Sequence, residues 1–209
     1  MTEELGFHHR FVAGTDGSTL LLLHGTGGNE ADLLGLGRML NPKANLLSPR
    51  GRVLENGMPR FFRRLAMGVF DVPDLIERTH ELARFIERAA AEYDLDPERL
   101  VAVGYSNGAN IAASLLFLHP ESLAGAALLH AMPPFYPDDL PDLDNKPVLL
   151  TAGRNDDMVP GDQAEVLGEL YRRAGAEVSL VWMPGGHELT PSELEITRDW
   201  LAEALRPVD

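Results

Sequence analysis

The stretch RLVAVGYSNGANIAA, from Arg99 to Ala113, changes character at its midpoint. Its first residues are mostly apolar and suit a buried strand, whereas its last residues suit a helix. At the junction, Ser106 stands between Gly104 and Gly108 in the pattern G-x-S-x-G. A polar residue at a strand-to-helix junction either caps the helix or takes part in chemistry.

Six short apolar runs, including the one before Ser106, follow one another along the chain. Their apolar residues are continuous rather than alternating, which is typical of strands buried on both faces of a parallel sheet. The runs are Thr19–Gly25, Ala44–Gly51, Arg99–Ser106, Leu123–Met132, Pro147–Asp156 and Glu177–Gly186.

Helical patterns lie between the runs, with apolar residues at spacings of three and four. Asp74 and Glu77 resemble a capping box at the start of the first helix. The sequence therefore predicts an α/β fold: a mostly parallel central sheet, helices on both faces and no large lid. The helical segments are Leu75–Tyr93, Ala164–Tyr171 and Leu194–Leu205.

Three segments do not fit this alternation. The stretch FHHRFVAG, from Phe7 to Gly14, is predicted to be an antiparallel edge strand. Leu54–Pro73 and Pro133–Pro147 have no clear period and are predicted to be loops over one end of the sheet. Aromatic side chains there favour a pocket wall, although they could instead pack in a secondary core. The predicted pocket residues are Phe61, Phe62, Phe70, Phe135, Tyr136, Met158 and Trp182.

Composition narrows the classes of function. The chain has 209 residues, which predicts one domain, 1–209. Its net charge of −14 argues against nucleic acid or an anionic membrane surface as a partner. The absence of cysteine excludes disulfides, thiolate metal sites and a cysteine nucleophile. No targeting signal or membrane span is evident, and we expect a cytoplasmic protein.

The glycines around Ser106 have a steric purpose. A sharp strand-to-helix turn forces the middle residue toward a strained backbone, and its flanking residues must lack bulk. The serine hydroxyl is then exposed at the end of the strand. The amide of Asn107 lies at a helix N-terminus, where unpaired donors and the helix dipole favour an anion.

A serine nucleophile needs a base, and the base needs an orienting group. In open parallel sheets, such partners lie at the carboxyl ends of later strands. Asp156 and Asp157 follow the fifth run, and His187 follows the sixth. His130 ends the fourth run and could border the site. The order serine, aspartate, histidine is that of α/β-hydrolases.

A second donor for an oxyanion is available after the first run. The segment LLLHGTGGNE, Leu21–Glu30, ends that run in a glycine-rich turn, and the amide of Thr26 can face the serine. His24 in this turn is interpreted as a structural hydrogen bonder. No metal site is predicted.

With these pieces the chain resembles the α/β-hydrolase superfamily. More narrowly, it resembles the phospholipase/carboxylesterase family of acyl-protein thioesterases and small bacterial carboxylesterases. The resemblance spans about Phe11 to Leu205, and RFFRRLAMGVFD at 60–71 looks especially like the bacterial carboxylesterases. Its other motifs are HGTGGNE at 24–30, GYSNGA at 104–109, GRNDDMVP at 153–160 and GGHEL at 185–189.

The resemblance implies a Ser106–His187–Asp156 triad, with Thr26 and Asn107 as oxyanion donors. The family pattern Asp-Pro-x-Val-Pro matches Asp156 to the acid, but Asp157 replaces the usual proline, so both carboxylates remain candidates. The expected activity is hydrolysis of small esters with short to medium acyl chains, without metal or cofactor. A thioesterase, another hydrolase with the same residues and a non-catalytic binding module remain alternatives. A homodimer is plausible for the family.

Overall fold

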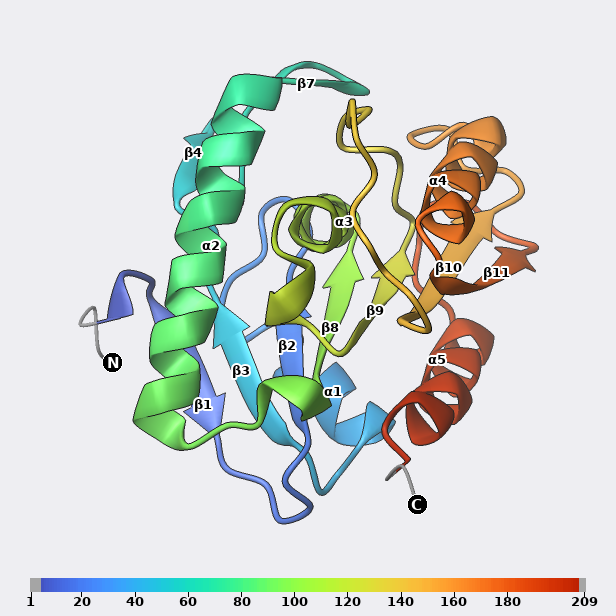
Figure 1. Cartoon of the computed structure of the whole chain (residues 1–209). Helices are drawn as coiled ribbons and strands as arrows, with labels where there is room; N and C mark the ends of the chain where they lie inside the picture. Colours follow the sequence, from blue (N-terminus) through green and yellow to red (C-terminus); the bar gives the residue numbers. More distant parts are fainter. Residues whose placement is uncertain (1–4, 207–209) are drawn as a thin grey trace.

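The computed structural model describes residues 5–206 and contains a seven-stranded sheet (Figure 1). The strand order is β1-β3-β2-β8-β9-β10-β11; β1 pairs antiparallel with β3, and the remaining neighbours are parallel. This confirms the predicted fold class and the antiparallel edge strand. The strands are β1 (His9–Val12), β2 (Thr19–Leu23), β3 (Asn45–Pro49), β8 (Leu100–Tyr105), β9 (Gly125–Leu129), β10 (Pro147–Gly153) and β11 (Glu177–Met183).

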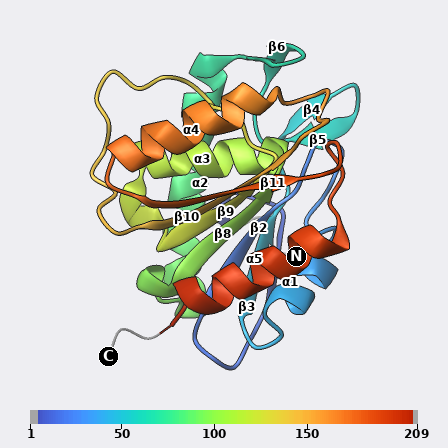
Figure 2. The same ribbon diagram turned by 90° about the vertical axis from the view of Figure 1, so that its right-hand side faces the viewer.

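Five α-helices cover the two faces of the sheet. Figure 2 shows α2, α3 and α4 on one face, and α1 and α5 on the other. Within residues 5–206, no helix combines the length and the apolar composition needed to cross a membrane. The helices are α1 (Leu34–Leu40), α2 (Val72–Tyr93), α3 (Asn107–Leu118), α4 (Gly161–Arg173) and α5 (Pro191–Ala204), with short 3-10 turns at Pro97–Arg99 and Pro120–Ser122.

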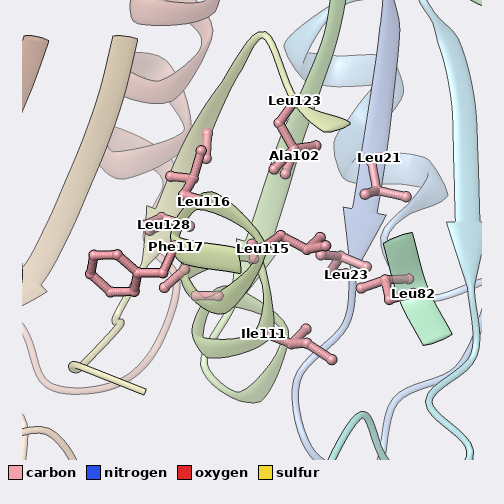
Figure 3. Close-up of a cluster of buried hydrophobic side chains, with 14 of the residues drawn as sticks. Leu21, Leu23, Leu82, Ala102, Ile111, Leu115, Leu116, Phe117, Leu123 and Leu128 are labelled. Carbon is pink, nitrogen blue, oxygen red and sulfur yellow. The ribbon is translucent and has the colours of Figure 1, made fainter. Parts of the chain in front are cut away.

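Strand β2 shows why its apolar run is continuous. All five of its residues are buried. Leu21 and Leu23 belong to the core cluster under α2 and α3, whereas Leu20 and Leu22 belong to the cluster under α1 and α5. Successive side chains of a strand point to opposite faces, so a strand between two helix layers needs apolar residues at every position. Figure 3 shows the first of these clusters, where α3 packs against β2, β8 and β9.

The segment between β3 and α2 differs from its prediction as a loop. It forms two small antiparallel hairpins, β4 (Val53–Glu55) with β5 (Met58–Arg60) and β6 (Arg64–Ala66) with β7 (Val69–Phe70). Each strand has two or three residues, too few to show a period of two. In Figure 1, β4 and β7 lie toward the end to which β8 and β9 point.

The start of α2 also differs from its prediction. The N-cap is Asp71, whose side chain accepts a hydrogen bond from the amide of Asp74. The helix therefore begins three residues before the start that the predicted capping box of Asp74 and Glu77 indicates. Asp74 is buried in the first turn, and its carboxylate accepts a hydrogen bond from the amide of Arg63. Asp74 thus holds the second hairpin against the helix.

The chain reverses its direction across the sheet between β2 and β8. The helix after β2 covers one face, while the helix after β8 covers the other. At such a switch point, the loops after the two strands separate and leave a crevice at the carboxyl edge. The loop after β2 carries Thr26, and the turn after β8 carries Ser106.

Candidate active site

Ser106 joins β8 to α3 in a backbone conformation that residues other than glycine rarely adopt. Its φ is 53° and its ψ is −114°, and its amide donates a 2.9 Å hydrogen bond to the carbonyl of Leu129. A methyl group on Gly104 would overlap the carbonyl of Gly108, and one on Gly108 would overlap the carbonyl of Leu23. The two glycines therefore permit the sharp turn that presents the serine hydroxyl.

His187 lies between Ser106 and Asp156. Its Nε2 is 2.8 Å from Ser106 Oγ, and its Nδ1 is 2.7 Å from Asp156 Oδ2. The other carboxylate oxygen, Oδ1, accepts hydrogen bonds of 2.8 and 2.9 Å from the amides of Met158 and Val159. Because a carboxylate only accepts, His187 Nδ1 carries the proton and Nε2 presents its lone pair to the serine hydroxyl.

The side chain of Asp156 is only 1% exposed. Burial alone would raise its pKa, but the hydrogen bonds from His187 and from the amides of Val159 and Met158 outweigh burial and lower the pKa below 3.8. Asp156 is therefore an anion at neutral pH. Asp157, the other candidate, is exposed, and the carboxylate that meets His187 is that of Asp156.

The loops that carry Asp156 and His187 pack closely on each other. Gly153 ends β10, and a methyl group there would overlap the carbonyl of Gly186. The amide of Asn155 donates a 3.1 Å hydrogen bond to the carbonyl of Gly185. The absence of side chains at these positions lets the two loops approach, so that the imidazole reaches the carboxylate.

Thr26 and Asn107 lie beside Ser106, on the two sides of the switch point. Both line one pocket together with Ser106 and His187. The Thr26 hydroxyl accepts a 2.7 Å hydrogen bond from Arg60, which anchors the loop after β2 to the first hairpin. Asn107 is the first residue of α3, where backbone amides have no helical partners. Its amide therefore belongs to a helix end that favours negative charge.

This pocket has an empty volume of about 380 Å³, part of it open to solvent. Two of the seven predicted pocket residues, Phe70 and Met158, line it. The other five lie elsewhere. Phe61 and Phe62 are buried in the core beneath the hairpins, Phe135 packs against Phe117, Tyr136 is exposed and Trp182 stacks against Arg154.

Arginines contribute to the pocket wall; the sequence had offered Arg64 as a residue that could meet an acidic substrate, but it gave no indication of Arg60. Arg60 and Arg64 both line the pocket, and both pair with the carboxylate of Glu55, at 3.2 and 2.9 Å. Two cations share one anion, which leaves a net positive charge beside the serine. The ion pair between Arg60 and Glu55 could have indicated these arginines, but it lies in a hairpin that was predicted to be a loop.

The side chain of Asn107 has a second task. Its Oδ1 accepts a 2.8 Å hydrogen bond from the amide of Phe61, which fixes the buried Phe61–Phe62 segment to the start of α3. Its Nδ2 is buried and has no hydrogen-bond partner among the described residues. Only the backbone amide of Asn107 could be predicted from the sequence, since nothing local indicates a partner 46 positions away.

Only one trio of residues in 5–206 has donor atoms close enough for a metal ion: His130, Asp156 and His187, all within 4.8 Å of one another. Their closest contacts are 2.7 Å and 3.0 Å from the two rings to Asp156 Oδ2. These are hydrogen-bond distances, so the three side chains form a hydrogen-bonded network. His130 contacts the carboxylate and does not line the pocket.

The chain is similar to proteins that are named hydrolases or carboxylesterases. The Bacillus subtilis protein MhqD, a hydrolase by name, is 52% identical over 197 residues, covering 94% of this chain and 98% of MhqD. The crystal structure of the Bacillus cereus carboxylesterase superposes with a TM-score of 0.93 at 50% identity, covering 95% of this chain and 94% of that one. A carboxylesterase structure from Mesorhizobium loti gives a TM-score of 0.90 at 34% identity, with 97% of both chains covered.

A family model provides the assignment. The description of that model is "Dienelactone hydrolase family", and it matches residues 72–198. This range includes Ser106, Asp156 and His187, and it covers more than half of the chain. The chain therefore belongs to the dienelactone hydrolase family, within the α/β-hydrolase fold.

Proposed function

We propose that this protein is a carboxylesterase that hydrolyses esters of short to medium acyl chains through Ser106, His187 and Asp156. The observation that carries the proposal is the continuous hydrogen-bonded chain from Ser106 Oγ to His187 and on to Asp156, at 2.8 and 2.7 Å. The names of the relatives from Bacillus cereus and Mesorhizobium loti support the same reaction class.

In the first step, Ser106 Oγ attacks the ester carbonyl carbon while its proton passes to His187 Nε2. The carbonyl oxygen becomes an anion and accepts hydrogen bonds from the amides of Thr26 and Asn107. One such donor is worth about 3 kcal/mol in the transition state. The carbon–oxygen bond to the alcohol then breaks, and His187 Nε2 gives its proton to the leaving oxygen.

In the second step, water attacks the acyl group on Ser106. His187 takes a proton from the water, and the same two amides hold the second oxyanion. The bond to Ser106 breaks, the serine regains its proton from His187, and the carboxylic acid leaves. Asp156 remains an anion throughout and stabilises the imidazolium that forms in each step.

The pocket supports the proposed acyl length. Its cavity volume of about 30 Å³ is far below the 300–1,000 Å³ that is usual for sites enclosing a drug-sized ligand. The second hairpin, which lines the pocket, is short, with strands of three and two residues. Esters with acyl chains near butyrate should therefore react faster than palmitoyl esters.

The test is hydrolysis of p-nitrophenyl esters and acyl-CoA thioesters of graded chain length. Wild type is compared with Ser106→Ala and with Ser114→Ala, which makes the same change at a buried serine of the helix that follows Ser106. Ser106→Ala should lower kcat by about six orders of magnitude, while Ser114→Ala retains activity. Full activity in folded Ser106→Ala would contradict the mechanism.

The substrate series separates the remaining classes. Faster turnover of thioesters than of matched esters would make the protein a thioesterase with the same residues. No turnover of either, together with no labelling of Ser106 by a fluorophosphonate, would favour a non-catalytic binding module.

A further inference from the structure

His130 follows β9 and is fully buried, with a positive φ of 58°. The left-handed backbone turns the chain sharply, and its amide remains bonded to the carbonyl of Thr151 on β10 at 3.0 Å. The ring is thereby directed beneath the loop that carries Asp156. A non-glycine residue in this conformation costs free energy, so the surrounding contacts must hold it there.

Each ring nitrogen of His130 faces a different carboxylate. Nδ1 is 3.0 Å from Asp156 Oδ2, the same oxygen that meets His187. Nε2 is 3.3 Å from Glu193 Oε1 and 3.4 Å from its Oε2. Glu193 lies in the first turn of α5, and its side chain is fully buried.

Glu193 also accepts hydrogen bonds from two threonines. The Thr151 hydroxyl donates a hydrogen bond to Oε1, and the amide of Thr190 donates one to Oε2. Both carboxylate oxygens of Glu193 therefore act as acceptors. With an anion on each side of the ring, a neutral His130 would direct a lone pair at a carboxylate oxygen. The geometry therefore favours the doubly protonated ring.

The electrostatics agree with this assignment. Burial alone lowers the pKa of His130, but the hydrogen bonds and charges of Glu193 and Asp156 outweigh burial and raise it. The remaining titratable groups around the ring are His187, whose ring centroid lies 5.1 Å away, Tyr105 at 5.9 Å, and the carboxylate of Glu188.

We propose that His130 is a positioning residue that is protonated on both ring nitrogens, is paired with Glu193 and holds the Asp156 carboxylate against His187. This role rests on the proposed function, because it acts on hydrolysis only through Asp156 and His187. Held in this way, the Asp156 carboxylate orients His187 so that its Nε2 faces Ser106 Oγ.

The charge of His130 and its position lead to separate predictions. In His130→Gln, the side-chain amide no longer holds Asp156 from the same place, and kcat/KM should fall about 10- to 100-fold. A positive charge near His187 is also lost, so the acid limb of kcat/KM should move about one pH unit higher. A merely structural role would not move that limb.

The matched control is Thr197→Val. Thr197 is buried on α5 one turn after Glu193, and its hydroxyl bonds to the backbone carbonyl of Glu193 rather than to His130. The variant should lose stability while keeping the wild-type acid limb. Kinetics on p-nitrophenyl butyrate between pH 5 and 9, with circular dichroism as the check of folding, compare the three proteins.

Nitrogen NMR of the histidine rings tests the charge directly, with His130→Gln assigning the signal. In wild type at pH 6.5, both nitrogens of His130 should have imidazolium shifts, and Glu193→Gln should lower the pH at which this signal titrates. A neutral His130 in wild type, or an unshifted acid limb in folded His130→Gln, would overturn the proposal. Full activity in Ser106→Ala would instead contradict the proposed function.

Discussion

The Tyr105 hydroxyl donates a 2.7 Å hydrogen bond to the backbone carbonyl of His187. Tyr105 is the variable residue directly before Ser106, and the two partners are 82 positions apart. Burial, followed by the charges of Asp156, Glu193 and Glu188, raises the pKa of Tyr105, so its hydroxyl stays a donor at neutral pH. The turn that carries the proposed nucleophile thus also holds the loop of the proposed base.

Replacing Tyr105 by phenylalanine removes this hydrogen bond and keeps the ring. A typical hydrogen bond contributes about 0.5–1.5 kcal/mol, and here it acts on the position of His187. We expect kcat to fall about three- to tenfold with little change in KM. Steady-state kinetics on a short p-nitrophenyl ester measure the effect.

The control for this prediction is Tyr171→Phe. The Tyr171 hydroxyl is buried and donates a 2.9 Å hydrogen bond to the carbonyl of Ala113, in the core under α3 and α4. This variant should lose stability and keep its kcat. Equal losses of kcat in the two variants would mean that Tyr105 has no specific effect on His187.

Gly153→Ala tests the contact between the loops of Asp156 and His187. The added methyl group would overlap the carbonyl of Gly186, which is backbone and cannot move aside alone. One loop must shift, and a displacement near 1 Å at a reacting group costs about 100-fold in rate. We expect kcat/KM to fall by about that factor, together with a lower melting temperature.

Gly35→Ala is the matched control. Gly35 lies in α1, and a methyl group there meets no atom within 4 Å. Alanine favours the helix over glycine by about 0.5–1 kcal/mol, so this variant should be more stable and fully active. Wild-type activity in Gly153→Ala would show that the loops can separate without disturbing His187.

Local patterns predicted the parallel strands well, because each lies between helix layers and needs apolar residues throughout. The short hairpins could not be found in this way. Their strands have two or three residues, and their pairing depends on contacts such as Arg60 with Glu55. Phe61 and Phe62 were expected at the pocket for the same reason. An aromatic residue in a segment without assigned structure looks exposed, and the contact of the Phe61 amide with Asn107 that buries this segment cannot be seen in the sequence.

The candidate site was also predictable only in part. Ser106, Asp156 and His187 each follow a strand, so topology alone predicted that they would meet at one edge. Glu193 lies on a helix and reaches His130 across 63 positions, through burial rather than through any motif. Its other task, closing a capping box with Thr190, is the only one that its local sequence indicates.

Asn107→Ala tests the link between α3 and the hairpin segment. The substitution leaves the buried amide of Phe61 without its acceptor, which costs about 1–3 kcal/mol. The backbone amide of residue 107 remains, so the proposed oxyanion donor is kept. We therefore expect a lower free energy of unfolding in urea and a smaller effect on kcat than Tyr105→Phe has.

Asn110→Ala serves as its control, since Asn110 Oδ1 accepts a similar 2.9 Å hydrogen bond, from the amide of Met132. Both variants should lose comparable stability. Increased proteolysis of the hairpins should accompany only Asn107→Ala. Equal cleavage of the hairpins in the two variants would contradict the anchoring role of Asn107.

His24 gives a prediction about stability and pH. Its Nδ1 donates a 2.7 Å hydrogen bond to the carbonyl of Gly25, and its Nε2 accepts a 3.0 Å hydrogen bond from the amide of Gly51. The buried ring is therefore neutral, as expected for a structural hydrogen bonder. Burial is the largest cause that lowers the pKa of His24 below its ordinary value of 6.5.

The sign of the effect follows from proton binding. Below about pH 6.5, the unfolded chain binds a proton at His24 while the folded chain does not, so acid favours unfolding. The contribution of His24 is complete above pH 6.5 and declines as the pH falls toward its lower folded pKa. The slope is at most about 1.4 kcal/mol per pH unit.

His24→Asn separates this contribution from those of the other histidines. At pH 7.5 the variant should be less stable than wild type, because the amide of Gly51 loses its acceptor. The difference in the free energy of unfolding between the two proteins should shrink on acidification from pH 7 to 5. Only wild type has a ring at position 24 that binds a proton on unfolding, so only wild type loses this stability in acid. Urea titrations across that range measure it. A difference that is constant or grows toward pH 5 would mean that His24 is protonated in the folded protein, which its contacts with Gly25 and Gly51 do not allow.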